Sequence, residues 1–265
     1  MDENIITSRQ NPLIQQVRKL QTSRAFRNQT GRFVADGTKL LQEAVRWCGG
    51  LETALVTPDL GKLDVPAGVR VVRVSKELMA YASQMEAPQG ALFICRMPEP
   101  KPQRLRPGTL ALDGVQDPGN LGTILRTADA LGAPLLALTQ GCADLWNPKT
   151  VRASMGAAFR LPVVSLTARD LIGQCRAQGL RLLASALSET AQPIGEASLE
   201  NAVMLVGSEG RGVSPELLEA ADGHVIIPIR PRCESLNAAA AAAILLWEMG
   251  RAGAYATGGE HAESN

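Results

Sequence analysis

The second half of the chain alternates short apolar segments with amphipathic ones, and this alternation constrains the fold more than any other feature. Strands that are apolar throughout are expected at residues 110–112, 134–138, 161–165, 181–186, 202–206 and 224–229. Helical patterns separate most of them, at residues 121–131, 149–159, 168–178 and 215–221, before an alanine-rich helix at 236–251. Strands without a polar face, joined by helices, are typical of a parallel sheet that is covered on both faces. The sequence therefore predicts an α/β domain built on a parallel sheet.

A smaller α/β domain is expected before it. Residues 11–24 carry apolar side chains at helical spacing, with basic residues on the solvent side. A second helix is expected at 37–48, and short strands are expected at 33–35, 54–56, 70–74 and 91–95. Residues 96–109 contain four prolines and no apolar periodicity, which is typical of a linker. We therefore divide the chain into a first domain at 1–98, a linker at 99–108, a second domain at 109–252 and a flexible tail at 253–265.

Charge is distributed unevenly along the chain. Residues 1–107 hold 16 Lys/Arg against 10 Asp/Glu, whereas residues 108–265 hold 11 against 16. Such asymmetry indicates either a polyanionic partner for the first part or a solvated basic face, and charge alone does not separate the two. No apolar run reaches the roughly 18 residues of a membrane span. Because the N-terminus is also polar rather than signal-like, we expect a cytoplasmic protein.

Cysteine and histidine usage argues against a metal centre. The five cysteines are scattered and never form a C-x-x-C pair, and there are only two histidines. A disulfide framework or a zinc site is therefore not expected.

Three segments that follow strands contain the residue types that carry chemistry. In the first, Leu112 to Ala128, a strand leads through a Gly/Asp/Pro loop into a helix, at the sheet edge where such folds bind ligands. Asn120 suits the N-cap of that helix. Arg126 lies six residues later, so the two side chains do not share one helical stripe. Taken alone, they are better explained as a cap and a surface cation. The glycines do not form the G-x-G-x-x-G fingerprint, which argues against a dinucleotide-binding oxidoreductase.

The other two segments are also loops at strand ends. Met204 to Val213 leads from a strand into a glycine-rich turn that contains Glu209, and glycine lets backbone approach a ligand closely. Ile226 to Asn237 ends a strand at proline and then places Ser235 and Asn237 at a helix start, where short polar side chains act as caps or bind ligands. Taken one at a time, the first of these two segments is explained as well by a plain tight turn as by a ligand site, and the second as well by a plain capped helix.

In combination the three segments are far more specific. The order N-L-G-x-I-x-R-T-A, then V-G-x-E-G-x-G, then I-P followed by E-S-L-N-x-A-x-A resembles the SpoU family of RNA ribose 2′-O-methyltransferases, over roughly residues 110–251. Phe33 to Gly37 and the helix after it resemble the substrate-binding domain of many members, which is similar to a ribosomal-protein-like RNA-binding fold. Asp36 stands where that pattern more usually has Glu.

The resemblance implies a SPOUT fold with a trefoil knot in the C-terminal part of the catalytic domain. It also implies a homodimer whose active sites draw on both subunits. The methyl donor would be S-adenosylmethionine, with its adenine and ribose held by backbone at Gly207, Ile227 and Leu236. No metal takes part in this chemistry.

The resemblance also implies roles for the polar residues. Arg126 would act on the ribose 2′-hydroxyl, and around it would stand Asn120, Glu209, Ser235 and Asn237. Because the pKa of a guanidinium lies above about 12, we expect Arg126 to stabilise the developing alkoxide rather than to remove its proton.

The expected substrate is structured RNA, with 23S ribosomal RNA ahead of tRNA. Two alternatives keep the same fold: a catalytically silent RNA-binding protein, and a base methyltransferase of the wider SPOUT group. The intact motifs favour an enzyme, and the pairing of Asn120 with Arg126 favours ribose as the methylated group.

Overall fold

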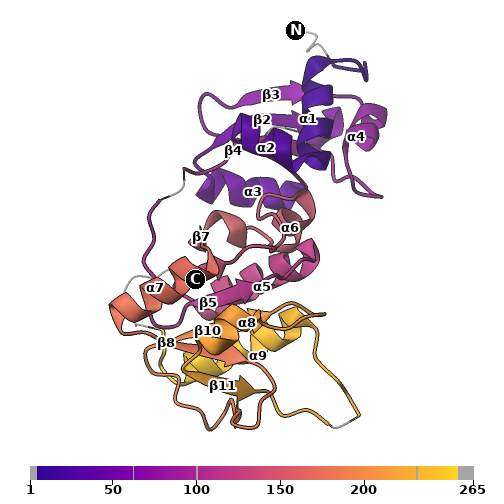
Figure 1. Cartoon of the computed structure of the whole chain (residues 1–265). Helices are drawn as coiled ribbons and strands as arrows, with labels where there is room; N and C mark the ends of the chain where they lie inside the picture. The colour runs from indigo at the N-terminus through magenta and orange to yellow at the C-terminus, as the bar shows by residue number, and fades with distance from the viewer. Residues whose placement is uncertain (1–4, 62, 100, 231, 256–265) are drawn as a thin grey trace. The chain divides into compact units, whose positions relative to one another are not determined.

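The computed structural model describes residues 5–61, 63–99, 101–230 and 232–255, and within these the chain forms two compact units (Figure 1). One unit comprises the described residues up to Glu99 together with Asp144–Arg160. The other comprises Lys101–Ala143 and the described residues from Leu161 onward. The boundaries at 1–98, 99–108 and 109–252 stay predictions. Most of the tail predicted at 253–265 lies outside the described residues. No described helix is long and apolar enough to cross a membrane.

The first unit contains a four-stranded sheet in the order β1-β4-β2-β3. Its strands are β1 (Arg32–Asp36), β2 (Leu51–Val56), β3 (Arg70–Arg73) and β4 (Ala91–Arg96). β4 pairs antiparallel with β1 and β2, while β3 pairs parallel with β2. One face of the sheet packs against α1 (Pro12–Thr22) and α4 (Lys76–Ala82), and the other packs against α3 (Thr38–Trp47). A 3-10 turn at Pro58–Leu60 follows β2.

The helix predicted at 11–24 is α1, which ends at Thr22, and a second helix that was not predicted, α2 (Arg24–Thr30), follows it. Ser23 has an extended backbone with φ −117°, and its hydroxyl accepts a hydrogen bond from the Phe26 amide at 3.1 Å. The last apolar position of the helical pattern is Leu20, so periodicity alone does not say at which of the following polar residues the helix ends. A serine that caps a following helix ends the preceding one because the capping residue has a non-helical backbone.

The second unit contains a seven-stranded sheet in the order β7-β6-β5-β10-β8-β11-β9, and all of its strand pairs are parallel. This confirms the predicted parallel α/β sheet. The strands are β5 (Leu110–Asp113), β6 (Leu136–Leu138), β7 (Val163–Ser165), β8 (Arg181–Ser185), β9 (Gln192–Pro193), β10 (Ala202–Gly207) and β11 (Gly223–Ile226).

Helices cover both faces of this sheet, which explains why its strands lack a polar face. On one face, α7 (Ala168–Gln178) and α8 (Pro215–Glu219) pack over alternate strand residues such as Ala111 and Leu205. On the opposite face, α5 (Pro118–Leu131) and α9 (Ala238–Arg251) pack against each other, and α9 contacts β10. Three buried alanines of α9, Ala238, Ala239 and Ala242, allow a close approach of the two helices.

Some predicted element boundaries were wrong for identifiable reasons. The helix predicted at 149–159 stops after α6 (Pro148–Ala153), because Met155 and Gly156 adopt left-handed backbone with φ 49° and 92°. A 3-10 turn at Ala157–Phe159 follows. The strand predicted at 224–229 ends at Ile226, two residues before Pro228, which cannot donate to a ladder and restricts the residue before it.

Candidate functional site

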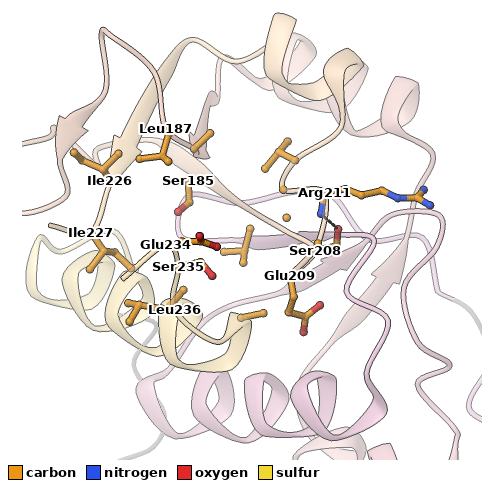
Figure 2. A pocket seen from close by; sticks show the side chains of 18 of the residues that line it. Ser185, Leu187, Ser208, Glu209, Arg211, Ile226, Ile227, Glu234, Ser235 and Leu236 are labelled. Carbon is orange, nitrogen blue, oxygen red and sulfur yellow. Dashed lines mark hydrogen bonds between the residues drawn. The ribbon is translucent and has the colours of Figure 1, made fainter. Parts of the chain in front are cut away.

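A cavity of about 420 Å³ opens at the carboxyl ends of β8, β10 and β11 (Figure 2). Its size is within the range of small-molecule sites, and its place is where open parallel sheets bind ligands. Three predicted backbone contacts, Gly207, Ile227 and Leu236, all line it, and so do Glu209 and Ser235. The glycine turn after β10 and the loop before α9 therefore share one cavity, although about 30 residues separate them in the sequence.

The glycine turn is closed by its own backbone. The Ser208 amide donates to the Gly212 carbonyl at 3.0 Å, and the Gly212 amide donates back to the Ser208 carbonyl at 2.9 Å. A side chain at Gly207 would place its Cβ 2.0 Å from the Gly212 carbonyl carbon. Because carbon atoms pack best at about 3.5–4.0 Å, a Cβ this close to backbone does not fit, and only glycine at this position allows the turn to close.

Three polar residues from distant segments form one hydrogen-bonded chain beside this turn. The side-chain amide of Asn120 donates to the Glu209 carboxylate, and the side-chain amide of Asn237 donates to Asn120 Oδ1 at 3.1 Å. A carboxylate only accepts, so the orientation of both amide groups is determined along the chain. Asn237 Oδ1 in turn accepts from the Ala239 amide at 2.9 Å, at the start of α9. The network joins the starts of α5 and α9 to the glycine turn.

The caps of the two helices differ in part from those predicted. Asp117, not Asn120, caps α5, because its carboxylate accepts a hydrogen bond from the backbone amide of Asn120 at 2.8 Å. Asn120 therefore lies within the first turn, which leaves its side chain available for the network. Asn237 caps α9 as predicted, whereas Ser235 lies in the preceding loop and lines the cavity.

Asp113 is a positioning residue that the sequence analysis missed. It is 8% exposed at the end of β5, where one carboxylate oxygen accepts from the Thr139 hydroxyl at 2.5 Å. The other oxygen accepts from the Ser214 amide at 2.7 Å. A buried carboxylate with both oxygens satisfied ties β5 to the loops that follow β6 and β10, so it supports the glycine turn from behind.

Arg126 stands apart from the other predicted site residues within one chain. Its side chain is exposed on α5. In the part of the chain that the structure describes, no hydrogen bond or ion pair joins it to Asn120, Glu209 or Asn237. One chain thus brings seven of the eight predicted residues into or beside the cavity, and it leaves the guanidinium on an outer helix surface.

The cavity also contains residues that were not singled out from the sequence: Ser185, Leu187, Arg211 and Glu234. Glu234 belongs to the E-S-L-N segment, so that motif held the signal. Figure 2 shows Glu234 and Ser235 among the lining side chains, while the Arg211 side chain extends away from them. With Glu209, the cavity has two carboxylates and an apolar wall of Leu187, Ile227 and Leu236, which suits a ligand that is part apolar ring and part cation.

Comparison with known proteins identifies related sequences over nearly the whole chain. Residues 107–247 match the SpoU rRNA Methylase family, and residues 11–92 match the MRM3-like substrate binding domain. The chain is 35% identical to the 23S rRNA (guanosine(2553)-2′-O)-methyltransferase RlmP of Bacillus subtilis, over 92% of this chain and 98% of that protein. It is 30% identical to human mitochondrial rRNA methyltransferase 3, over 85% of this chain and 69% of that protein.

A solved structure supports the same relationship. An AdoMet-bound rRNA methyltransferase from Sinorhizobium meliloti superimposes with a TM-score of 0.82 at 32% identity. The match covers 93% of this chain and 97% of that one.

Proposed function

Because the chain belongs to the SpoU rRNA methylase family, we propose that it transfers a methyl group from S-adenosylmethionine to a ribose 2′-hydroxyl of ribosomal RNA. The observation that carries this proposal is the convergence of the three motif segments. The Glu209–Asn120–Asn237 chain of hydrogen bonds and the cavity behind it share Glu209, so the polar network borders the space for the donor.

The residues that line the cavity fit the methyl donor. Leu187, Ile227 and Leu236 offer apolar surface for adenine, and the backbone beside Gly207 can hydrogen-bond its edge. The carboxylates of Glu209 and Glu234 favour the positive charge of a sulfonium or ammonium group. When bound, the donor supplies an electrophilic methyl group, and no residue of the cavity needs a metal ion for this chemistry.

We assign to Arg126 the stabilisation of the developing alkoxide on the ribose oxygen. A guanidinium stays protonated, so it stabilises negative charge instead of accepting a proton. Asn120, held by Glu209 and Asn237, presents a fixed amide at the border of the cavity and would orient the nucleotide. Ser235 adds a hydroxyl on the cavity wall.

A homodimer would bring Arg126 to the cavity of a second subunit. The outer surface of α9 carries an apolar stripe of Ala240, Ile244 and Trp247, and Trp247 is 60% exposed. Exposed apolar stripes of this kind mark interfaces, and α5 packs directly beside α9. We therefore propose that two copies associate through α9 and α5, with Arg126 of one facing the donor of the other.

The first unit, which matches a substrate binding domain, would bind RNA, and we place 23S ribosomal RNA before tRNA. Action on ribosomal RNA would occur in the cytoplasm of a bacterium, as the Bacillus relative suggests. The position of β10 between β5 and β8 is consistent with a trefoil knot in the second unit.

The test is methyl transfer from labelled S-adenosylmethionine to ribosomal RNA that lacks its natural methylations. Nuclease digestion and nucleoside mass spectrometry should then detect one 2′-O-methylated nucleoside. A base-methylated nucleoside would show that the family fold serves a different reaction here. Absence of any labelled product with both ribosomal RNA and tRNA would support the catalytically silent alternative.

A further inference from the structure

One stretch of the first unit, residues 5–31, contains basic residues and no acidic ones. It holds five Lys/Arg. One of the five, Arg27, is 2% exposed and pairs with Asp144 at 2.6 Å, so its charge is neutralised by a carboxylate of the same unit. The other four reach the surface of α1, α2 and the segment before α1, and we call them the α1–α2 face: Arg9, Arg18, Lys19 and Arg24.

Several basic side chains elsewhere in the same unit are neutralised by carboxylates. Glu52 pairs with both Arg32 and Arg96, and Asp59 pairs with Lys76 at 3.0 Å. Among the residues that the structure describes, no ion pair holds any of the four side chains of the α1–α2 face. Uncompensated like charges repel one another, so a surface that keeps them is suited to a polyanion.

An aromatic ring holds two of these cations in place. The guanidinium carbons of Arg9 and Arg18 lie 4.4 and 4.2 Å from the centre of the Tyr81 ring, on α4. Arg18 Nη1 also donates to the Tyr81 carbonyl at 3.2 Å, and Gln15 donates to the Arg9 carbonyl at 2.7 Å. Figure 1 shows α1, α2 and α4 together in the first unit. Two long side chains are thereby ordered before any ligand arrives, which lowers the entropy cost of binding.

We propose that the α1–α2 face binds the sugar–phosphate backbone of the RNA substrate, with Arg9 and Arg18 as two phosphate contacts. This inference rests on the proposed function. A guanidinium fork matches phosphate geometry, and Tyr81 is engaged by the two guanidinium groups instead of offering its ring to a base. Contacts of this type position the RNA and carry no sequence information, so recognition of the target nucleotide belongs elsewhere.

The salt dependence of RNA binding tests the proposal. Each lost phosphate contact lowers the slope of log affinity against log salt concentration by about 0.7 for single strands to 0.9 for duplexes. The double variant Arg9→Ala/Arg18→Ala should therefore lose about 1.4 to 1.8 from the slope of the full-length protein on ribosomal RNA fragments. The control variant Lys39→Ala/Arg46→Ala removes the same charge from α3, on the opposite face of the sheet, and its slope should stay near that of the wild type.

A third variant tests the role of the ring separately. Tyr81→Leu keeps both charges but removes the surface over which they lie, so the salt slope should stay unchanged. The affinity should fall by about five- to thirtyfold, which corresponds to the loss of two exposed cation–π contacts. An unchanged affinity in Tyr81→Leu would show that the ring does not order the arginines for RNA.

The affinity for S-adenosylmethionine should be unchanged in the Arg9/Arg18 double variant, whereas methyl transfer at limiting RNA should fall together with RNA binding. An unchanged slope in that variant, or an equal loss in the control, would overturn the assignment of this face while leaving the methyltransferase proposal intact. Conversely, a wild-type protein that binds RNA through this face but methylates nothing would refute the proposed function alone.

Discussion

Replacement of Gly207 by alanine should open the glycine turn and weaken donor binding. The added Cβ would lie 2.0 Å from the Gly212 carbonyl carbon, 2.2 Å from the Val213 nitrogen and 2.3 Å from the Gly212 oxygen. Since carbon atoms pack best at about 3.5–4.0 Å, the two sides of the turn must separate by about 1.5 Å. These contacts are with backbone atoms, which cannot rotate away as the end of a side chain could.

The cost follows from the two hydrogen bonds that close the turn, between Ser208 and Gly212 at 3.0 and 2.9 Å. A separation of this size would break both, and each contributes about 0.5–1.5 kcal/mol, so the loss is about 1–3 kcal/mol. If the whole loss falls on the donor site, the affinity for S-adenosylmethionine decreases by about 5- to 150-fold.

Isothermal titration calorimetry with S-adenosylmethionine measures this loss, and Gly210→Ala is the matched control. Gly210 lies in the same turn, but a Cβ there would meet no atom within 4 Å. Gly210→Ala should therefore bind the donor with wild-type affinity. Wild-type affinity in Gly207→Ala, or an equal loss in both variants, would refute the reasoning from backbone closure.

Three further variants test other parts of the molecule. Arg126→Ala should lower the methyl-transfer rate by about 10²–10³-fold in single-turnover assays, because it removes electrostatic stabilisation of the alkoxide, while donor affinity stays unchanged. Burial raises the pKa of the Asp36 carboxyl, so the contribution of this group to stability is fully present below the ordinary carboxyl pKa of about 3.9 and is lost as pH rises through the raised value. Denaturant titrations between about pH 3.5 and 8 should show a smaller loss of stability with rising pH in Asp36→Asn than in the wild type. Trp247→Asp should convert a dimer into monomers in analytical ultracentrifugation and reduce activity with it, because a charge would replace the exposed apolar side chain of α9.

Each of these has a result that contradicts it. Near-normal turnover in Arg126→Ala would show that the guanidinium does not stabilise the transition state. An identical pH dependence of unfolding in Asp36→Asn and wild type would mean that this carboxyl does not carry the linkage. A Trp247→Asp protein that stays dimeric would place the interface away from α9.

Local patterns in the sequence were enough to predict the class of the second unit and most of its elements, although not β9. Apolar strands such as 110–112 and 202–206 have no polar face because helices cover the sheet on both sides. The run of apolar residues in a single strand therefore indicates how the whole sheet is covered. The same holds for Gly207 and Asn237, whose roles in a tight turn and a helix cap depend on neighbouring residues. The three motifs in order indicated the family because their residues resemble those of its members.

Contacts between segments that lie far apart in the sequence could not be predicted and became visible only in the tertiary structure. Asn120 and Asp117 both suit a helix cap, and which of them caps α5 depends on whether Glu209 and Asn237, 89 and 117 residues from Asn120, draw its side chain away. Likewise, nothing in the pattern of residues 144–160 shows that they pack in the first unit, where Arg27 pairs with Asp144. Periodicity and capping act over a few residues and are visible in the sequence, whereas pairings across the chain depend on how it closes on itself.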